Sequence, residues 1–98
     1  MQTITPAELK ERLANGTAPL ILDVREQDEW NAGHIESARL VPLATVDARV
    51  GEVAPDKSAE IVVHCARGGR SARACASMEA MGYTNVKNLE GGYLSFEG

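Results

Sequence analysis

The sequence predicts an α/β protein whose parallel sheet carries helices on both faces. Two short apolar runs, Leu20-Ile21-Leu22 and Ile61-Val62-Val63, are typical of strands that are buried on both faces. Segments with the apolar spacing of helices stand between and after these runs, and strands that alternate with helices indicate a parallel sheet. A chain of 98 residues has too little interior for two separate cores, so we expect one domain over residues 1–98.

The first helix has a clear start and a clear end. Thr5 is a typical N-cap, Pro6 suits the first helical position, and Glu8 completes a capping box with Thr5. Asn15-Gly16 is a typical helix end. The sequence therefore predicts a helix between these two signals.

The remaining elements follow in alternation. We expect a buried strand over residues 20–24, a short helix over 26–30, a short strand over 39–41 that Pro42 ends, a helix over 43–50 that Gly51 closes, a buried strand over 61–64, an amphipathic helix over 70–81 that Gly82 ends, and a short strand over 85–89. Gly91-Gly92 then turns the chain into a terminal segment with apolar residues.

Composition excludes several classes of protein. With 44% hydrophobic and 24% charged residues, the chain has the composition of an ordinary globular protein. A formal net charge of −4 argues against a nucleic acid as partner. No apolar run approaches the roughly 20 residues that cross a bilayer, and residues 1–4 lack the features of a signal peptide. We therefore expect a cytoplasmic protein without a membrane partner.

The two cysteines, Cys65 and Cys75, differ in their surroundings. Their number and separation fit neither a disulfide framework nor a C-x-x-C redox pair, so both are expected to be free thiols. Cys75 lies on the apolar stripe of the helix over 70–81, which predicts a small core residue. Cys65 directly follows the strand over 61–64. In parallel α/β folds, ligands bind beyond the carboxyl ends of the strands.

The loop that begins at Cys65 is predicted to bind an anion. Two glycines permit a sharp turn with backbone N–H groups facing inward, and the following helix N-terminus favours negative charge. These N–H groups, together with positive charges from arginines in a stretch from Ile61 to Met78 without acidic residues, would lower the pKa of the thiol from its ordinary value of about 8.5. We therefore expect a nucleophilic Cys65 and a substrate-binding loop of Ala66, Arg67, Gly68, Gly69 and Arg70.

Two alternatives apply to this region. Cys65 could be an inert buried cysteine, but this leaves the paired glycines and the arginines without a purpose. His64 precedes the cysteine on a strand whose alternate side chains point to opposite faces, so we expect a structural role for it.

Several short motifs, each weak alone, together resemble the signatures of the rhodanese family, in order and over most of the chain. The motifs are Asp23-Val24-Arg25-Glu26, Glu29-Trp30, Gly33-His34-Ile35-Glu36-Ser37-Ala38, Val63-His64-Cys65 with Arg70-Ser71-Ala72, Gly82-Tyr83, and Leu89-Glu90-Gly91-Gly92. The resemblance implies a rhodanese-like fold with a parallel sheet of about five strands. It also implies a catalytic cysteine in a six-residue loop, here Cys65 to Arg70.

The chain departs from the family at two places. Phe96 stands where the family usually has tryptophan, and Ser37 stands where many members have glycine. Neither position lies in the reactive loop. Among the other motif residues, Asp23, Arg25, Glu29 and His34 are expected to hold loops by charge-assisted hydrogen bonds rather than to take part in the chemistry.

The resemblance implies a sulfurtransferase of the thiosulfate type that needs no metal or organic cofactor. The Cys65 thiolate would take a sulfane sulfur from a small anionic donor such as thiosulfate and hold it as a persulfide. A thiophilic acceptor, such as cyanide, a small thiol or a protein thiol, would then remove the sulfur.

Three other functions remain open. A catalytically silent rhodanese-like binding module would use the same fold, although such modules typically lack the cysteine. A cysteine phosphatase or arsenate reductase also resembles His-Cys with an arginine-bearing loop, but that loop is one residue longer, and here Ser71 falls where its arginine would stand. A zinc site from His34, His64, Cys65 and Cys75 does not match common ligand spacings.

Overall fold

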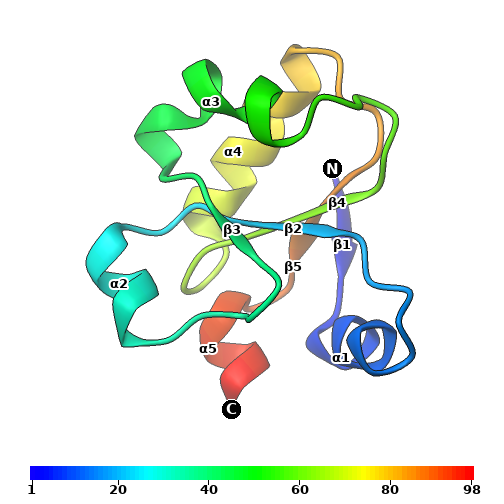
Figure 1. Ribbon diagram of the computed structural model, residues 1–98, viewed down its shortest axis with the longest axis vertical. Coiled ribbons are helices and arrows are strands. Elements are labelled where there is room, and N and C mark those ends of the chain that lie inside the picture. The colour runs from blue at the N-terminus through cyan, green and yellow to red at the C-terminus, as the bar shows by residue number, and fades with distance from the viewer.

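The computed structural model describes residues 1–98 and shows five parallel strands in one sheet (Figure 1). The strands are β1 (Gln2–Ile4), β2 (Leu20–Asp23), β3 (Arg39–Leu40), β4 (Ile61–His64) and β5 (Val86–Leu89). Their order across the sheet is β1-β5-β4-β2-β3. This confirms the predicted α/β class with a parallel sheet of five strands. Because β4 is the middle strand, its carboxyl end has neighbours on both sides.

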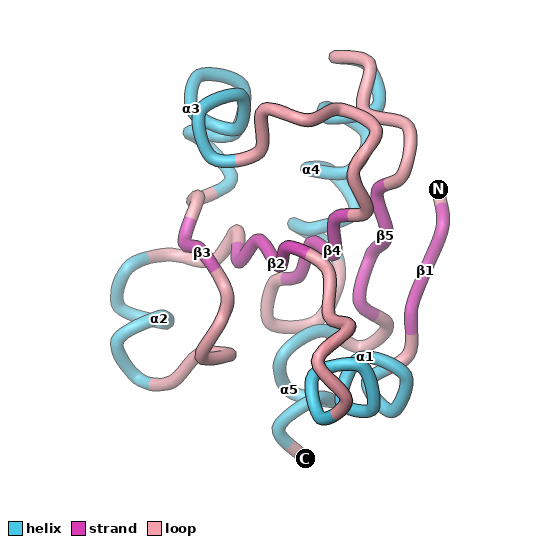
Figure 2. Tube along the Cα trace, turned by 45° about the vertical axis from the view of Figure 1, so that its right-hand side comes forward, coloured by secondary structure: helices cyan, strands magenta, loops and turns pink.

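Helices cover both faces of the sheet, as predicted. They are α1 (Pro6–Ala14), α2 (Gln27–Ala32), α3 (Val46–Val53), α4 (Gly69–Ala80) and α5 (Gly92–Glu97). Two views show α3 and α4 on one face and α1 and α5 on the other, with α2 beside the β3 edge (Figure 2). No helix has the length and apolar character needed to cross a bilayer.

The sheet buries two separate apolar clusters because successive residues of a strand point to opposite faces. Leu22 and Val63 lie in the cluster beneath α3 and α4. Ile21 and Val62 lie in the opposite cluster, against which Trp30 of α2 and Phe96 of α5 pack. All four residues of β4 are buried, which confirms the prediction of a strand covered on both faces.

The predicted element boundaries are largely confirmed, with one error and one omission. The capping box of Thr5 and Glu8 is present, with Pro6 at the helix start. The prediction that Gly51 closes a helix over 43–50 is wrong, because residues 43–45 form a 3₁₀ turn and α3 continues through Gly51 to Val53. Strand β1, which pairs with β5, was not predicted from the sequence.

The apolar cluster beneath α3 and α4 makes a testable contribution to stability. Leu22 is fully buried, so Leu22→Ala should lower the free energy of unfolding by about 2–5 kcal/mol through lost burial and the remaining cavity. Leu94 is 48% exposed, and Leu94→Ala should change the free energy of unfolding by less than about 0.5 kcal/mol. Urea titrations of both variants measure the difference. Equal effects would contradict this assignment of the core.

Candidate active site

Cys65 lies at the carboxyl end of β4, where the sequence analysis placed a ligand site. Cys65 is 1% exposed and lines a cavity of about 320 Å³. The cavity is lined by Cys65, Ala66, Arg67, Gly69 and Arg70. The structure thus gathers five of the six predicted residues around one cavity, and the sixth, Gly68, contacts the sulfur through its backbone.

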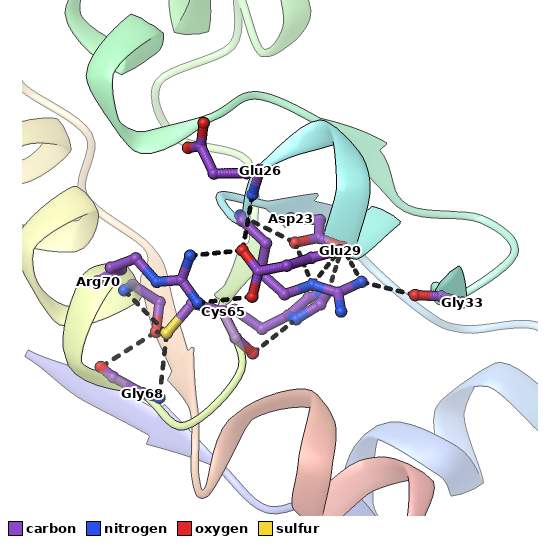
Figure 3. A network of polar contacts seen from close by, with 10 residues as sticks. Asp23, Glu26, Glu29, Gly33, Cys65, Gly68 and Arg70 are labelled. Carbon is purple, nitrogen blue, oxygen red and sulfur yellow. Dashed lines mark hydrogen bonds and ion pairs between the residues drawn. The ribbon is translucent and has the colours of Figure 1, made fainter. Parts of the chain in front are cut away.

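The loop after β4 directs backbone N–H groups at the sulfur of Cys65. Gly68 has a φ of +113°, a conformation that favours glycine, and its N–H donates to Sγ over 3.0 Å (Figure 3). The N–H of Ser71, in the first turn of α4, also donates to Sγ over 3.4 Å. This is the cradle that the paired glycines predicted.

The start of α5 holds the loop from the other side. The N–H of Tyr93 donates to the Cys65 carbonyl oxygen over 2.8 Å, and the N–H of Leu94 donates to the Ala66 carbonyl oxygen over 3.1 Å. In a trans peptide the carbonyl and the following N–H point in opposite directions. The contact with α5 therefore turns the N–H groups of Ala66 and Arg67 away from α5.

Gly92 allows this close approach. A Cβ atom at this position would lie 2.5 Å from the Ala66 carbonyl carbon and oxygen and 2.7 Å from the Arg67 nitrogen. Its φ of +65° is also one that glycine adopts without strain. Any larger residue at position 92 would push α5 and the loop apart.

The environment of Cys65 favours its anionic form. Burial raises the pKa of the Cys65 thiol, but hydrogen bonds from the Ser71 hydroxyl and from the N–H groups of Ser71, Gly68 and Arg67 lower it, and the net pKa lies below the ordinary value. The direction agrees with the sequence analysis. The N–H groups of the loop were an expected cause, but hydrogen bonds, rather than the full positive charges of the arginines that were also expected, account for the favourable part.

Arg70 is not the free cation that its position in the loop suggested. Glu29 of α2 accepts two hydrogen bonds from its guanidinium group, over 2.6 and 2.9 Å (Figure 3). These bonds lower the pKa of Glu29 to about 2. The positive charge available to a ligand is therefore reduced, whereas Arg67 is exposed and forms no salt bridge.

A second polar cluster lies on the α5 side of the site. Arg25 donates to both carboxylate oxygens of Asp23 and to the Gly33 carbonyl, and its guanidinium lies 4.4 Å from the centre of the Tyr93 ring. His64 is fully buried, with Nε2 3.6 Å from Asp23 Oδ2, and burial lowers its pKa. The charge-assisted contacts expected for Asp23, Arg25 and Glu29 are therefore present.

The residues of the zinc alternative do not form a metal site. Cys75 is buried in the core cluster beneath α3 and α4, as predicted, and burial raises its pKa to about 12. His34 is exposed and stacks on Trp30 with a separation of 3.6 Å between ring centres. No group of three or more potential ligand side chains has metal-binding geometry.

Two polar residues of the site, Ser71 and Asn88, were not predicted from the sequence. Ser71 was noted only as part of a family motif and for its spacing from the cysteine, and Asn88 lies within the short strand β5. The structure places Ser71 Oγ 3.4 Å from Cys65 Sγ and 2.5 Å from Asn88 Oδ1. A polar residue at a buried strand position was the available signal, because a buried amide requires hydrogen-bond partners.

The fold and the site define an α/β protein that presents a cysteine in a loop of N–H donors at the end of a central strand. A family model for the rhodanese-like domain matches residues 5–98. The chain therefore belongs to the rhodanese-like family, as the ordered motifs predicted.

Similar proteins include sulfurtransferases. The chain is 33% identical over 93 residues to a sulfurtransferase of Allochromatium vinosum, covering 95% of this chain and 85% of that protein. It is 34% identical over 70 residues to the thiosulfate sulfurtransferase PspE of Escherichia coli, covering 71% and 67%. Other relatives are longer, and the chain spans only 24% of one from Mycobacterium tuberculosis.

A solved structure shows the same fold. The crystal structure of a thiosulfate sulfurtransferase from Pseudomonas aeruginosa superposes with a TM-score of 0.88 at 28% sequence identity. The match covers 99% of this chain and 19% of that one. The parallel five-stranded architecture is therefore the rhodanese architecture.

The close approach at Gly92 predicts a sharp response to a single added methyl group. Gly92→Ala should lower the free energy of unfolding by about 1–3 kcal/mol or more, because the added Cβ clashes with the loop backbone and the positive φ is strained for alanine. Gly51→Ala is the control, since nothing lies within 4 Å of its added Cβ, and it should stabilise α3 by up to about 1 kcal/mol. Thermal unfolding of the two variants compares them, and similar melting temperatures would contradict the tight contact.

The Glu29–Arg70 pair predicts a loss of stability in acid. The folded-state pKa of Glu29 lies near 2, below the ordinary value of 4.5, so the contribution of the pair is complete above about pH 4.5 and lost as the pH falls toward 2. Because both groups are partly exposed, we expect a contribution of roughly 1 kcal/mol. Glu29→Gln should remove this pH dependence in urea titrations. Asp28→Asn, on the same helix, should leave it unchanged.

Proposed function

We propose that the protein is a sulfurtransferase that moves a sulfane sulfur from thiosulfate, or a similar small anionic donor, to a thiophilic acceptor. The observation that carries the proposal is the position of Cys65 Sγ, which receives N–H groups of Gly68 and Ser71 beside a cavity that Cys65 lines. The A. vinosum relative is named a sulfurtransferase and the E. coli relative a thiosulfate sulfurtransferase, which supports the proposal.

In the first half of the reaction, the Cys65 thiolate attacks the outer sulfur of thiosulfate. A bond forms between Sγ and that sulfur, the S–S bond of thiosulfate breaks, and sulfite leaves with the bonding electron pair. The sulfur of Cys65 carries one negative charge before this step, as a thiolate, and the persulfide carries one after it. Fixed N–H donors stabilise such a charge without reorganising.

In the second half, the acceptor removes the sulfur. A nucleophile such as cyanide, a small thiol or a protein thiol attacks the outer sulfur of the persulfide, the S–S bond to Cys65 breaks, and Sγ leaves as a thiolate. The unpaired guanidinium of Arg67, at the exposed mouth of the cavity, is suited to the anionic end of the donor. Arg70 instead holds the loop against α2 through Glu29.

Intact mass spectrometry tests this proposal. Incubation with thiosulfate should add the mass of one sulfur atom, and subsequent cyanide should remove it. Cys65→Ala should abolish the gain. Cys75→Ala should retain it, because Cys75 is buried in the core and its raised pKa of about 12 keeps it a thiol.

Absence of any sulfur gain in folded, reduced protein would overturn the thiosulfate reaction. The same samples, incubated with an aryl phosphate, would then distinguish a phosphatase from a silent binding module.

A further inference from the structure

Ser71 and Asn88 lie directly behind Cys65. Ser71 is fully buried, and Asn88 on β5 is 9% exposed. Ser71 Oγ lies 3.4 Å from Cys65 Sγ, 3.1 Å from the Gly68 carbonyl oxygen and 2.5 Å from Asn88 Oδ1. A serine hydroxyl has a single hydrogen to donate. These three acceptors therefore compete for one proton.

The amide of Asn88 fits in one orientation only. Its Nδ2 donates to the Gly68 carbonyl over 3.3 Å, and a carbonyl oxygen only accepts. Oδ1 must therefore face Ser71, where it accepts the hydroxyl hydrogen over the shortest of the three distances. In this arrangement Ser71 presents lone pairs to Cys65 Sγ. Lone pairs suit a thiol S–H donor and oppose an anionic sulfur.

We propose that the Ser71 hydroxyl has two positions: it donates to Asn88 Oδ1 while Cys65 is a neutral thiol, and it turns to donate to Sγ when the sulfur becomes a thiolate or a persulfide anion. No covalent bond changes in this step, which is a rotation about Cβ–Oγ. Ser71 is then a catalytic residue, and Asn88 is a positioning residue that acts through it. The inference rests on the proposed function of Cys65 as the nucleophile.

Removal of the donor and removal of its competitor have opposite consequences. Ser71→Ala deprives the anionic sulfur of a donor and favours the thiol. Asn88→Leu, which is similar in size, removes the stronger competing acceptor and so favours the anion. In that variant the Gly68 carbonyl still accepts the N–H of Ala72 over 3.0 Å. A purely structural role for the pair would disturb the loop in both variants and shift Cys65 in the same direction.

The other ionisable groups around Cys65 are the same in all these variants. They are Arg67 and Arg70 of the loop, Glu29 of α2, His64 of β4 and Tyr93 of α5. A shift in the titration of Cys65 is therefore attributable to the hydroxyl and its partner.

The rate of alkylation by iodoacetamide, measured against pH, tests the proposal. All variants carry Cys75→Ala, so that Cys65 is the only thiol. Ser71→Ala should raise the midpoint by about one pH unit, and Asn88→Leu should lower it by a smaller amount. The double variant should match Ser71→Ala, because Asn88 acts only through the hydroxyl. Ser77→Ala, also on α4 but not bonded to the sulfur, is the matched control and should leave the midpoint unchanged.

A rise of the midpoint in Asn88→Leu, or an effect of that change that persists without the Ser71 hydroxyl, would overturn the proposal. If Asn88→Leu does not fold, NMR of the otherwise unaltered chain decides. The side-chain amide signals of Asn88 should then shift with the same midpoint as Cys65, and constant signals would overturn the proposal. Iodoacetamide needs no sulfur donor, so this test is independent of whether the protein transfers sulfur.

Discussion

Two hydrogen bonds from the start of α5 to the loop after β4 determine where the site holds negative charge. The N–H groups of Tyr93 and Leu94 draw the carbonyls of Cys65 and Ala66 to one side. Because carbonyl and N–H alternate along a trans backbone, the N–H groups of the loop then turn to the other side. Without that contact, carbonyl oxygens could face the sulfur and repel an anion.

The order of the strands brings α5 to this position. β5 lies beside β4, so the chain leaves β5 next to the loop that follows β4, and Gly92 lets the backbones meet. Phe96, at the place where the family usually has tryptophan, packs against the apolar cluster that contains Ile21 and Val62 and so holds α5 against the sheet. A six-residue helix thus owes its position to a glycine at its start and an aromatic ring near its end.

The sequence was informative where local chemistry decides the structure. The N-cap of α1, the buried strand β4 and the turn at Gly68 follow from side chains that are adjacent in the chain. β1 was not predicted because it has three residues, only one of them buried, and exists through its pairing with β5. No local pattern distinguishes such a segment from a loop.

The site was predictable in its location but not in its electrostatics. The arginines near Cys65 suggested full positive charges around the sulfur, but the partner of Arg70 is 41 positions away in the sequence. Pairing across that separation depends on where α2 lies beside the loop, and spacing alone does not reveal it. The same applies to Ser71 and Asn88, which are 17 positions apart and meet only because α4 packs on β5.

Neutral donors around the sulfur have a consequence for the proposed reaction. If Arg70 were unpaired beside Sγ, it would attract the departing sulfite as strongly as the incoming thiosulfate, and the product would leave slowly. The ion pair with Glu29 weakens that attraction, while N–H dipoles still stabilise the single charge that remains on the sulfur. The unpaired Arg67 lies at the exposed mouth, where solvent screens its charge. In the proposed reaction, the N–H groups that hold the sulfur anion are thus separate from Arg67, which would meet the donor.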